Sequence, residues 1–211
     1  MTWDAQTLIH VAAYAGGGIA MGLGAMGAAI GEGYTAAQAN LAVSRNPKIS
    51  GDLFKNMLVG QAVAESASIF ALVIAILLLF LDTGASGLIK ASALLGAGIC
   101  MGCGAIGSGV GSGFPGGQAC LGIARQPAVT TRITTNMLIG SAVCQTPAIF
   151  SMVVALMLIF MDFSHNAFYP GWAALIGAGL STGLAAIGSG YGGGMAAGAC
   201  CEGIARQPDS V

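Results

Sequence analysis

Two acidic residues stand in apolar segments where an ionised side chain is costly. Glu65 lies in the run Gly60-Gln61-Ala62-Val63-Ala64-Glu65-Ser66, and Glu32 lies in a glycine-rich segment upstream. Arg45 lies between them, and a turn after it would account for its greater separation from Glu65 than from Glu32. In an antiparallel helical hairpin, this spacing puts both carboxyl groups at a similar depth. Ionisable groups inside membrane helices are usually functional, so a shared site is predicted.

The chemistry expected of such a pair is reversible binding of a cation. Two ionised carboxylates side by side would repel each other, so one is expected to hold a proton while the other binds a cation. Ser66 adds a hydroxyl group, and the carbonyl of Val63 lies in the same helical turn. Oxygen ligands of these kinds suit hard cations such as sodium. The structural alternative is a carboxyl pair that shares a proton and binds no ion.

The composition indicates an all-α membrane protein. Of the 211 residues, 55% are hydrophobic and only 7% are charged, whereas soluble domains carry about 25% charged residues. Long uncharged segments can cross a bilayer as helices of roughly 20 residues or more. The net charge of −1 includes no basic stripe, so no nucleic-acid partner is expected.

An internal repeat defines the architecture. An Arg-x-Pro triplet occurs three times at a nearly constant interval, and glycines ahead of each triplet recur in the same frame. Each repeat begins with a glycine-rich helix, turns at the triplet and returns through a bulkier helix. Glycines spaced four apart let helix backbones approach closely in lipid. The sequence therefore predicts an inner layer of glycine-rich helices with bulkier helices outside. The triplets are Arg45-Asn46-Pro47, Arg125-Gln126-Pro127 and Arg206-Gln207-Pro208.

Five transmembrane helices are expected in tandem hairpins. They are predicted over residues 8–43, 52–81, 88–123, 131–161 and 169–204. Hairpin 1 occupies residues 1–84, hairpin 2 occupies residues 85–165, and residues 166–211 form the first helix of an incomplete third hairpin. A sixth helix is expected either to come from another chain or to have been lost by truncation.

Basic residues predict the orientation. All but one of them lie on the Arg-x-Pro side, and Lys90 lies opposite. Because lysine and arginine are enriched in cytoplasmic loops, the Arg-x-Pro loops are expected to face the cytoplasm.

The second repeat lacks the carboxylates. Glu32 aligns with Ser112, Glu65 with Gln145, and Ser66 with Thr146. Oxygen atoms without negative charge compensate a dehydrated cation poorly, so one competent site per chain is predicted. Pro147 is also expected to kink the helix that carries Gln145.

Two other motifs are interpreted as structural. Cys100 and Cys103 have C-x-x-C spacing, but buried cysteine commonly acts as a small apolar residue. The run Gly107-Ser108-Gly109-Val110-Gly111 lies in the middle of a predicted span. It therefore lacks the preceding strand that a nucleotide-binding fingerprint requires.

The segment from Gly60 to Ser66, the glycine-rich first helix and the Arg-x-Pro loop together resemble the c subunit of F-type ATP synthases. The repeated hairpins are also similar to vacuolar-type proteolipids. The resemblance implies a rotor ring in the membrane, most simply the bacterial plasma membrane, built from copies of this chain or other c subunits. Glu65 would carry Na⁺ past an arginine of the stator a subunit, with Glu32, Val63 and Ser66 as further ligands. The three Arg-x-Pro loops would contact the central stalk.

Several alternatives remain at the level of sequence. Sodium-type members of that family often have a threonine and a tyrosine where this chain has Ala67 and Phe70, so H⁺ is the alternative cargo. The chain has no Walker-type loop or nucleophile triad, so it is expected to be a non-catalytic subunit without a cofactor. Rival interpretations are an uncoupled channel or small carrier, and a structural proteolipid.

Overall fold

The chain folds as a bundle of five long helices, as predicted. The computed structural model describes residues 4–80, 87–163 and 171–210. Each Arg-x-Pro loop contains a short 3₁₀ turn, and every one of the five helices is long and apolar enough to cross a membrane. The helices are α1 (Ala5–Arg45), α2 (Ser50–Phe80), α3 (Leu88–Arg125), α4 (Thr130–Phe160) and α5 (Gly171–Arg206), and the turns are η1 (Pro47–Ile49), η2 (Pro127–Val129) and η3 (Pro208–Ser210).

Most of the predicted helix boundaries fall within a few residues of the observed ones. The inner helices α1, α3 and α5 each continue to the arginine of the Arg-x-Pro triplet. In the first two loops the more extended conformation of the next residue ends the helix, and proline begins the 3₁₀ turn. Helix α4 runs from Thr130 to Phe160 through Pro147 without interruption. The predicted positions 81 and 169–170 lie outside the described residues.

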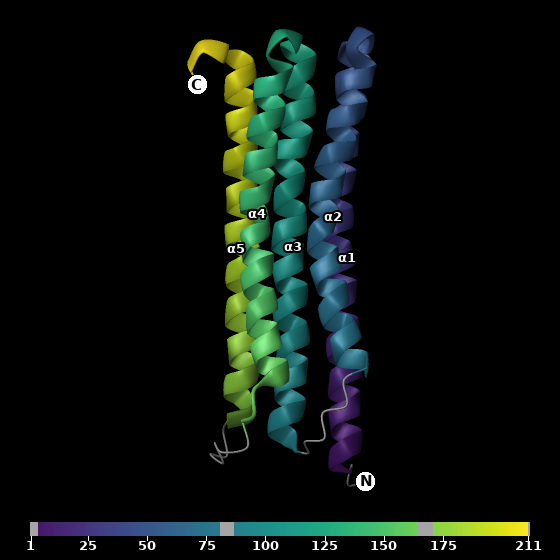
Figure 1. Cartoon of the computed structure of the whole chain (residues 1–211), viewed down its shortest axis with the longest axis vertical. Coiled ribbons are helices and arrows are strands. Elements are labelled where there is room, and N and C mark those ends of the chain that lie inside the picture. The colour runs from purple at the N-terminus through teal and green to yellow at the C-terminus, as the bar shows by residue number, and fades with distance from the viewer. Residues whose placement is uncertain (1–3, 81–86, 164–170, 211) are drawn as a thin grey trace.

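The helices form two layers, with α3 at the centre of the inner one. Helix α3 packs against both α1 and α5, while α2 and α4 pack against the inner helices from outside (Figure 1). Burial follows this arrangement, because most residues of α3 are buried, whereas only a minority of α5 residues are. The Arg-x-Pro loops gather at one end of the bundle, and α1 begins at the other end (Figure 1).

The same glycine contact occurs between α1 and α3 and again between α3 and α5. A Cβ atom added to Gly98 of α3 would lie 2.2 Å from the carbonyl oxygen of Gly16 in α1. A Cβ atom added to Gly179 of α5 would lie 2.2 Å from the carbonyl oxygen of Gly96 in α3. Only glycine permits this approach. The repeat in the sequence is therefore a repeat in the packing.

Both outer edges of the inner layer have glycines that meet nothing. Added Cβ atoms on these glycines would have no neighbour within 4 Å among the described residues. On α1 they are the counterparts of α3 glycines that pack on α1; on α5 they are the counterparts of α3 glycines that pack on α5. The open glycines are Gly18, Gly22 and Gly33 on α1, and Gly177, Gly188, Gly192 and Gly203 on α5.

The place for an outer helix beside α5 differs from the places that α2 and α4 occupy beside α1 and α3. In hairpins 1 and 2, Gly24 and Gly104 let the outer helix approach so closely that an added Cβ would lie 2.4 Å from Ala71 and 2.1 Å from Ser151. The third repeat has Ala185 at this position, and Ala185 lines a groove between α4 and α5. No described residue fills the place that an outer helix of a third hairpin would take.

Candidate ion-binding site

The residues that carry the two predicted carboxylates lie at one level, about halfway along hairpin 1. The Gln61 side chain of α2 donates a hydrogen bond to the backbone carbonyl of Glu32 in α1, with Nε2 and O 3.5 Å apart. A Cβ atom on Gly31 would lie 3.3 Å from the Cβ atom of Ala64. These contacts place both residues at one level of the hairpin, as the loop spacing predicts.

The carboxylate pair lies at the surface of the bundle. Glu65 is exposed and Glu32 is half-buried. The Ser68 hydroxyl donates to the backbone carbonyl of Glu65 at 2.7 Å, so it is engaged within its own helix. No ion pair to Glu65 or Glu32 occurs within residues 4–80, 87–163 and 171–210. The charge of this pair is therefore left to be balanced from outside the described chain.

Val63 and Ser66 face a different neighbour from Glu65. The Val63 carbonyl accepts a hydrogen bond from Gln145 Nε2 of α4 at 2.9 Å and another from the Ser66 hydroxyl at 2.6 Å. Successive helical residues are turned by about 100°, so the side chains of Val63 and Glu65 lie on nearly opposite faces of α2, about 160° apart. The four predicted ligands therefore do not share one site within the chain. Glu65 and Glu32 stay together, while Val63 and Ser66 belong to the interface with hairpin 2.

Hairpin 2 repeats the geometry of hairpin 1 without its carboxylates. The Ser141 hydroxyl donates to the carbonyl of Ser112 at 3.4 Å, which is the counterpart of the Gln61–Glu32 contact one repeat earlier. Ser112 and Gln145 thus occupy the places of Glu32 and Glu65. Thr146, the counterpart of Ser66, is exposed.

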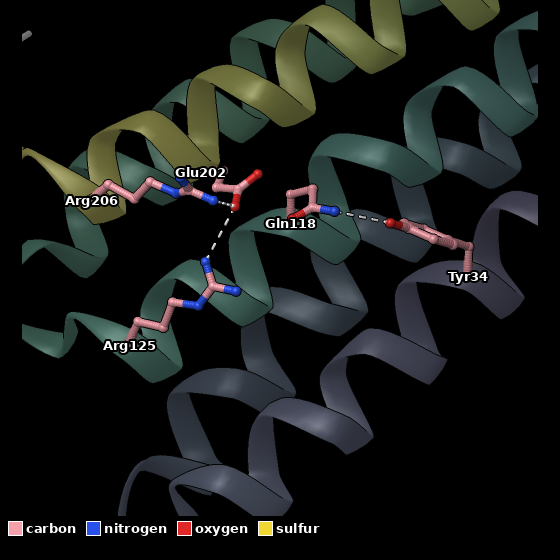
Figure 2. A network of polar contacts seen from close by, with 5 residues as sticks. All are labelled: Tyr34, Gln118, Arg125, Glu202 and Arg206. Atoms are coloured by element: carbon pink, nitrogen blue, oxygen red, sulfur yellow. Dashed lines mark hydrogen bonds and ion pairs between the residues drawn. The ribbon is translucent and has the colours of Figure 1, made fainter.

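A polar network joins the loops of the second and third repeats. Glu202 of α5 accepts from Arg206 at 2.6 Å and from Arg125 of α3 at 3.3 Å (Figure 2). Arg132 donates to the carbonyl of Pro208 at 2.9 Å. The first loop is joined to the second through the Asn46 side chain, which donates to the Ala124 carbonyl at 3.4 Å. The three loops therefore form one polar surface at the end of the bundle.

Three segments of the chain match the family model described as the C subunit of ATP synthase. They are residues 15–78, 95–158 and 176–211, which together make up most of the sequence. The chain belongs to the ATP synthase C-subunit family. The three matches follow the repeat, with hairpin 1, hairpin 2 and α5 each matching in turn.

Relatives of two lengths are similar to the chain. The ATP synthase c subunit of Natranaerobius thermophilus is 47% identical over 77 residues, which are 36% of this chain and 88% of that protein. The ATP synthase c subunit of Thermotoga maritima is 47% identical over 75 residues, with 36% and 88% covered. The K subunit of the A-type ATP synthase of Methanocaldococcus jannaschii is 32% identical over 196 residues, with 93% and 82% covered.

Three of the six cysteines are buried and form hydrogen bonds to polar groups of neighbouring helices. Cys100 donates to the Ser151 carbonyl at 3.4 Å. Cys120 and Cys201, which are repeat counterparts, accept from the side chains of Asn56 and Asn136 at 3.4 Å and 3.3 Å. In the part of the chain that the structure describes, no three His, Cys, Asp or Glu side chains gather as a metal site would require.

Sequence reasoning did not find two of the polar contacts between repeats. Gln118 of α3 donates to the Tyr34 hydroxyl of α1 at 3.1 Å (Figure 2), and Gln145 reaches Val63. Both contacts join residues that lie about one repeat apart along the chain. The repeat itself was the available signal, because residues one repeat apart lie on neighbouring hairpins.

Proposed function

We propose that this chain is a rotor-ring subunit in the membrane sector of a rotary ATP synthase or ATPase and carries Na⁺ on Glu65 past a stator arginine. The observation that carries the proposal is that Glu65 and Glu32 lie at one level at mid-span, with no cationic side chain paired to either among the described residues. An acid pair at this depth of a membrane is expensive unless it is loaded with a cation or a proton. Membership in the C-subunit family supplies the rotary context.

Ring assembly is supported by the open glycines of α1 and α5. Gly16 of α1 receives Gly98 of α3, and Gly96 of α3 receives Gly179 of α5. Continued by one more step, the same rule pairs Gly177 of α5 with Gly18 of a neighbouring copy. Both glycines lack a neighbour within 4 Å in the described structure. A head-to-tail contact of this kind closes into a ring when its rotation permits closure.

The chemistry at Glu65 follows from charge balance. One carboxyl group holds a proton while the other carries the cation, because two adjacent negative charges in a medium of low dielectric repel strongly. Passage past a positively charged stator arginine would favour the ionised carboxylate and release the cation. The remaining oxygen ligands come from outside the described residues of the chain, since Val63 and Ser66 face hairpin 2. In the head-to-tail ring Glu65 faces α5 of the preceding copy, at the place where the outer helix of a third hairpin would lie.

Protons are the second candidate cargo, and two residues favour them. Ala67 is fully buried and has no side-chain oxygen, while Phe70 packs with the apolar core and has no hydroxyl group. Neither side chain can hold a water molecule on a sodium ion or orient a carboxylate. A proton needs only Glu65 itself and an acceptor for the acid hydrogen.

The basic end of the bundle would face the cytoplasm and the central stalk. The three Arg-x-Pro loops gather there, with Arg45, Arg125 and Arg206 at the ends of the inner helices. Enrichment of arginine and lysine on one side of a membrane protein marks the cytoplasmic side. For a bacterial chain this orientation implies the plasma membrane.

Carbodiimide labelling of the assembled complex tests the cargo and the carrier together. Glu65 should be the labelled residue, sodium should protect it, and labelling should stop ATP turnover. Glu65→Gln is the matched control, because it keeps the size of the side chain and removes the acid. Labelling of Glu65 that sodium never slows, at any pH, would leave protons as the cargo. Undiminished ATP-coupled transport by the Glu65→Gln variant would exclude Glu65 as the carrier.

A further inference from the structure

A cavity lies at the end of hairpin 1 that is remote from the Arg-x-Pro loops. At this end α1 extends past the last turn of α2 (Figure 1). The cavity has a volume of about 360 Å³ and is lined by α1, by the last turn of α2 and by α3. This volume is typical of pockets that bind small ligands.

The wall formed by α1 carries a row of hydrogen-bond donors. Gln6, His10 and Tyr14 line the cavity and stand four residues apart, so they follow one another along one face of the helix. The rings of His10 and Tyr14 are neighbours, with centroids 6.1 Å apart. An amide, an imidazole and a phenol can each donate a hydrogen bond. This wall therefore suits a group that accepts hydrogen bonds.

The wall formed by α2 presents acceptors instead. Residues 77–80 line the cavity, and α2 ends at Phe80. The last four carbonyl groups of an α-helix have no hydrogen-bond partner within the helix, and the helix dipole gives this end a partial negative charge. A positively charged donor is therefore favoured at this wall.

Hairpin 2 shows which donor fits at the end of an outer helix. Lys90 is the repeat counterpart of His10, and Ile159 is the counterpart of Leu79. The Lys90 ammonium group donates to the backbone carbonyl of Ile159, in the last turn of α4. In hairpin 1 the shorter side chain of His10 replaces the lysine, and His10 and Leu79 both line the cavity. The cavity thus lies where a primary ammonium group is bound one repeat later.

We propose that this cavity binds the headgroup of a phospholipid that carries a primary amine, the phosphatidylethanolamine class. The ammonium group of the lipid donates to the carbonyl groups at the end of α2, as Lys90 donates to the end of α4. The phosphate accepts hydrogen bonds from the donor row of α1. The acyl chains pack on apolar side chains beside the cavity, among which Phe80 is 81% exposed. The lipid joins the ends of α1 and α2, as Lys90 joins α3 to α4.

The charge of the lining selects among lipid headgroups. No Lys, Arg, Asp or Glu side chain is among the described residues that line the cavity, so an ion of either sign would enter without a counter-charge. A zwitterionic headgroup brings both charges itself. Phosphatidylglycerol has no ammonium group, and the quaternary ammonium group of phosphatidylcholine has no N–H to donate. Phosphatidylethanolamine is therefore expected to bind more tightly than either.

Native mass spectrometry of the assembled complex in detergent, with one lipid added at a time, tests this preference. One phosphatidylethanolamine per chain should stay bound, with an affinity roughly tenfold or more above that of phosphatidylcholine or phosphatidylglycerol with the same acyl chains. A difference of this size is expected from one charge-assisted hydrogen bond. Equal retention of the three lipids would overturn the proposal. Glycerophosphoethanolamine, which has the headgroup without acyl chains, should compete weakly, and competition as strong as that of the lipid would also overturn it.

His10→Lys gives hairpin 1 the lysine that hairpin 2 has. The new ammonium group should occupy the site and lower the affinity for phosphatidylethanolamine roughly tenfold or more. Val11→Lys is the matched control, because it adds the same charge at the next residue, which is exposed and does not line the cavity. It should leave lipid binding unchanged. Equal effects of the two variants would contradict the site.

Lys90→His is the reciprocal variant, because it removes the ammonium group from hairpin 2. It should raise the bound phosphatidylethanolamine from one to two molecules per chain, and a count that stays at one would refute the equivalence of Lys90 and the headgroup. If a variant does not fold, the headgroup preference of the unmodified chain still decides the proposal. Glu65 does not line this cavity, so sodium protection of Glu65 should be the same in His10→Lys and in the unmodified chain. Failure of lipid binding is therefore distinguishable from failure of the proposed ion carrier.

Discussion

Replacing Gly18 with alanine is expected to weaken the association between copies while each chain still folds. Within the chain, a Cβ atom at Gly18 has no neighbour within 4 Å among the described residues. At its counterpart Gly98, the same atom would lie 2.2 Å from the Gly16 carbonyl oxygen. If the next copy repeats this contact, the alanine would meet the carbonyl of Gly177 of that copy. The two helices would have to separate by roughly 1 Å, which is an overpacking change.

The magnitude follows from the cost of overpacking. Forcing one extra methyl group into a close-packed contact costs about 1–3 kcal/mol, which corresponds to an association constant roughly 5- to 150-fold lower. Native electrophoresis or mass photometry over a series of detergent concentrations would measure it as earlier dissociation of the assembly. A circular dichroism melt of the dissociated chain should be unchanged.

Two further variants make the Gly18 experiment decisive. Gly51→Ala is the matched control, because Gly51 also meets nothing within 4 Å and its repeat counterpart is the exposed residue Thr131. Gly98→Ala makes the same clash inside the chain, so it should destabilise the chain itself. Assemblies of Gly18→Ala that are as stable as those of Gly51→Ala would show that copies do not associate through this glycine face.

Three other predictions address the site and the packing. Ser66→Ala should leave sodium protection of Glu65 unchanged. Glu32→Ala should weaken that protection by about 1.5–3 kcal/mol, on the scale of a hydrogen bond to a charged group. Equal effects of the two variants in the labelling assay would contradict the assignment of Glu32 and Ser66 to different interfaces. Asn56→Leu should destabilise the chain by about 1–3 kcal/mol, because the buried Asn56 side chain forms hydrogen bonds with both Cys120 and Thr134. An unchanged melting temperature in detergent would show that these hydrogen bonds do not stabilise the fold. Sodium protection should weaken as pH falls, because protons and sodium compete for the same carboxylate; protection that is constant across the pH range would refute the competition.

The fold could be predicted from sequence because its signals are local or periodic. Apolar length gave the number of spans, and the Arg-x-Pro triplets gave the hairpin turns. The glycine register also predicted an inner layer, and the close contacts of Gly98 with Gly16 and of Gly179 with Gly96 confirm it. Each of these signals depends on neighbours in the chain or on a fixed repeat length.

It was harder to predict which neighbouring helix each side chain faces. Val63 and Ser66 stand just before and just after Glu65, so along the sequence they resemble one ligand set. Helix geometry places Val63 and Glu65 on nearly opposite faces of α2, about 160° apart. The residue that shows which neighbour Val63 faces is Gln145, on another hairpin. Proximity along a helix was taken for proximity in space. Counting angles around α2 together with the repeat offset would have separated the two interfaces.

The number of carboxylate pairs per copy determines how much transport energy a ring of such copies couples to each turn. One copy contributes three inner helices to the circumference but one carboxylate pair at mid-span. Each elementary charge crossing the membrane is worth about 2.3 kcal/mol per 100 mV. A ring with a neutral amide at every Gln145 therefore gathers less energy per turn than an equally large ring with an acid on every hairpin. The same sparse loading lets ATP hydrolysis drive fewer ions against a steeper gradient. We therefore expect Gln145→Glu to raise the number of ions moved per ATP and to lower the steepest gradient that the complex can sustain.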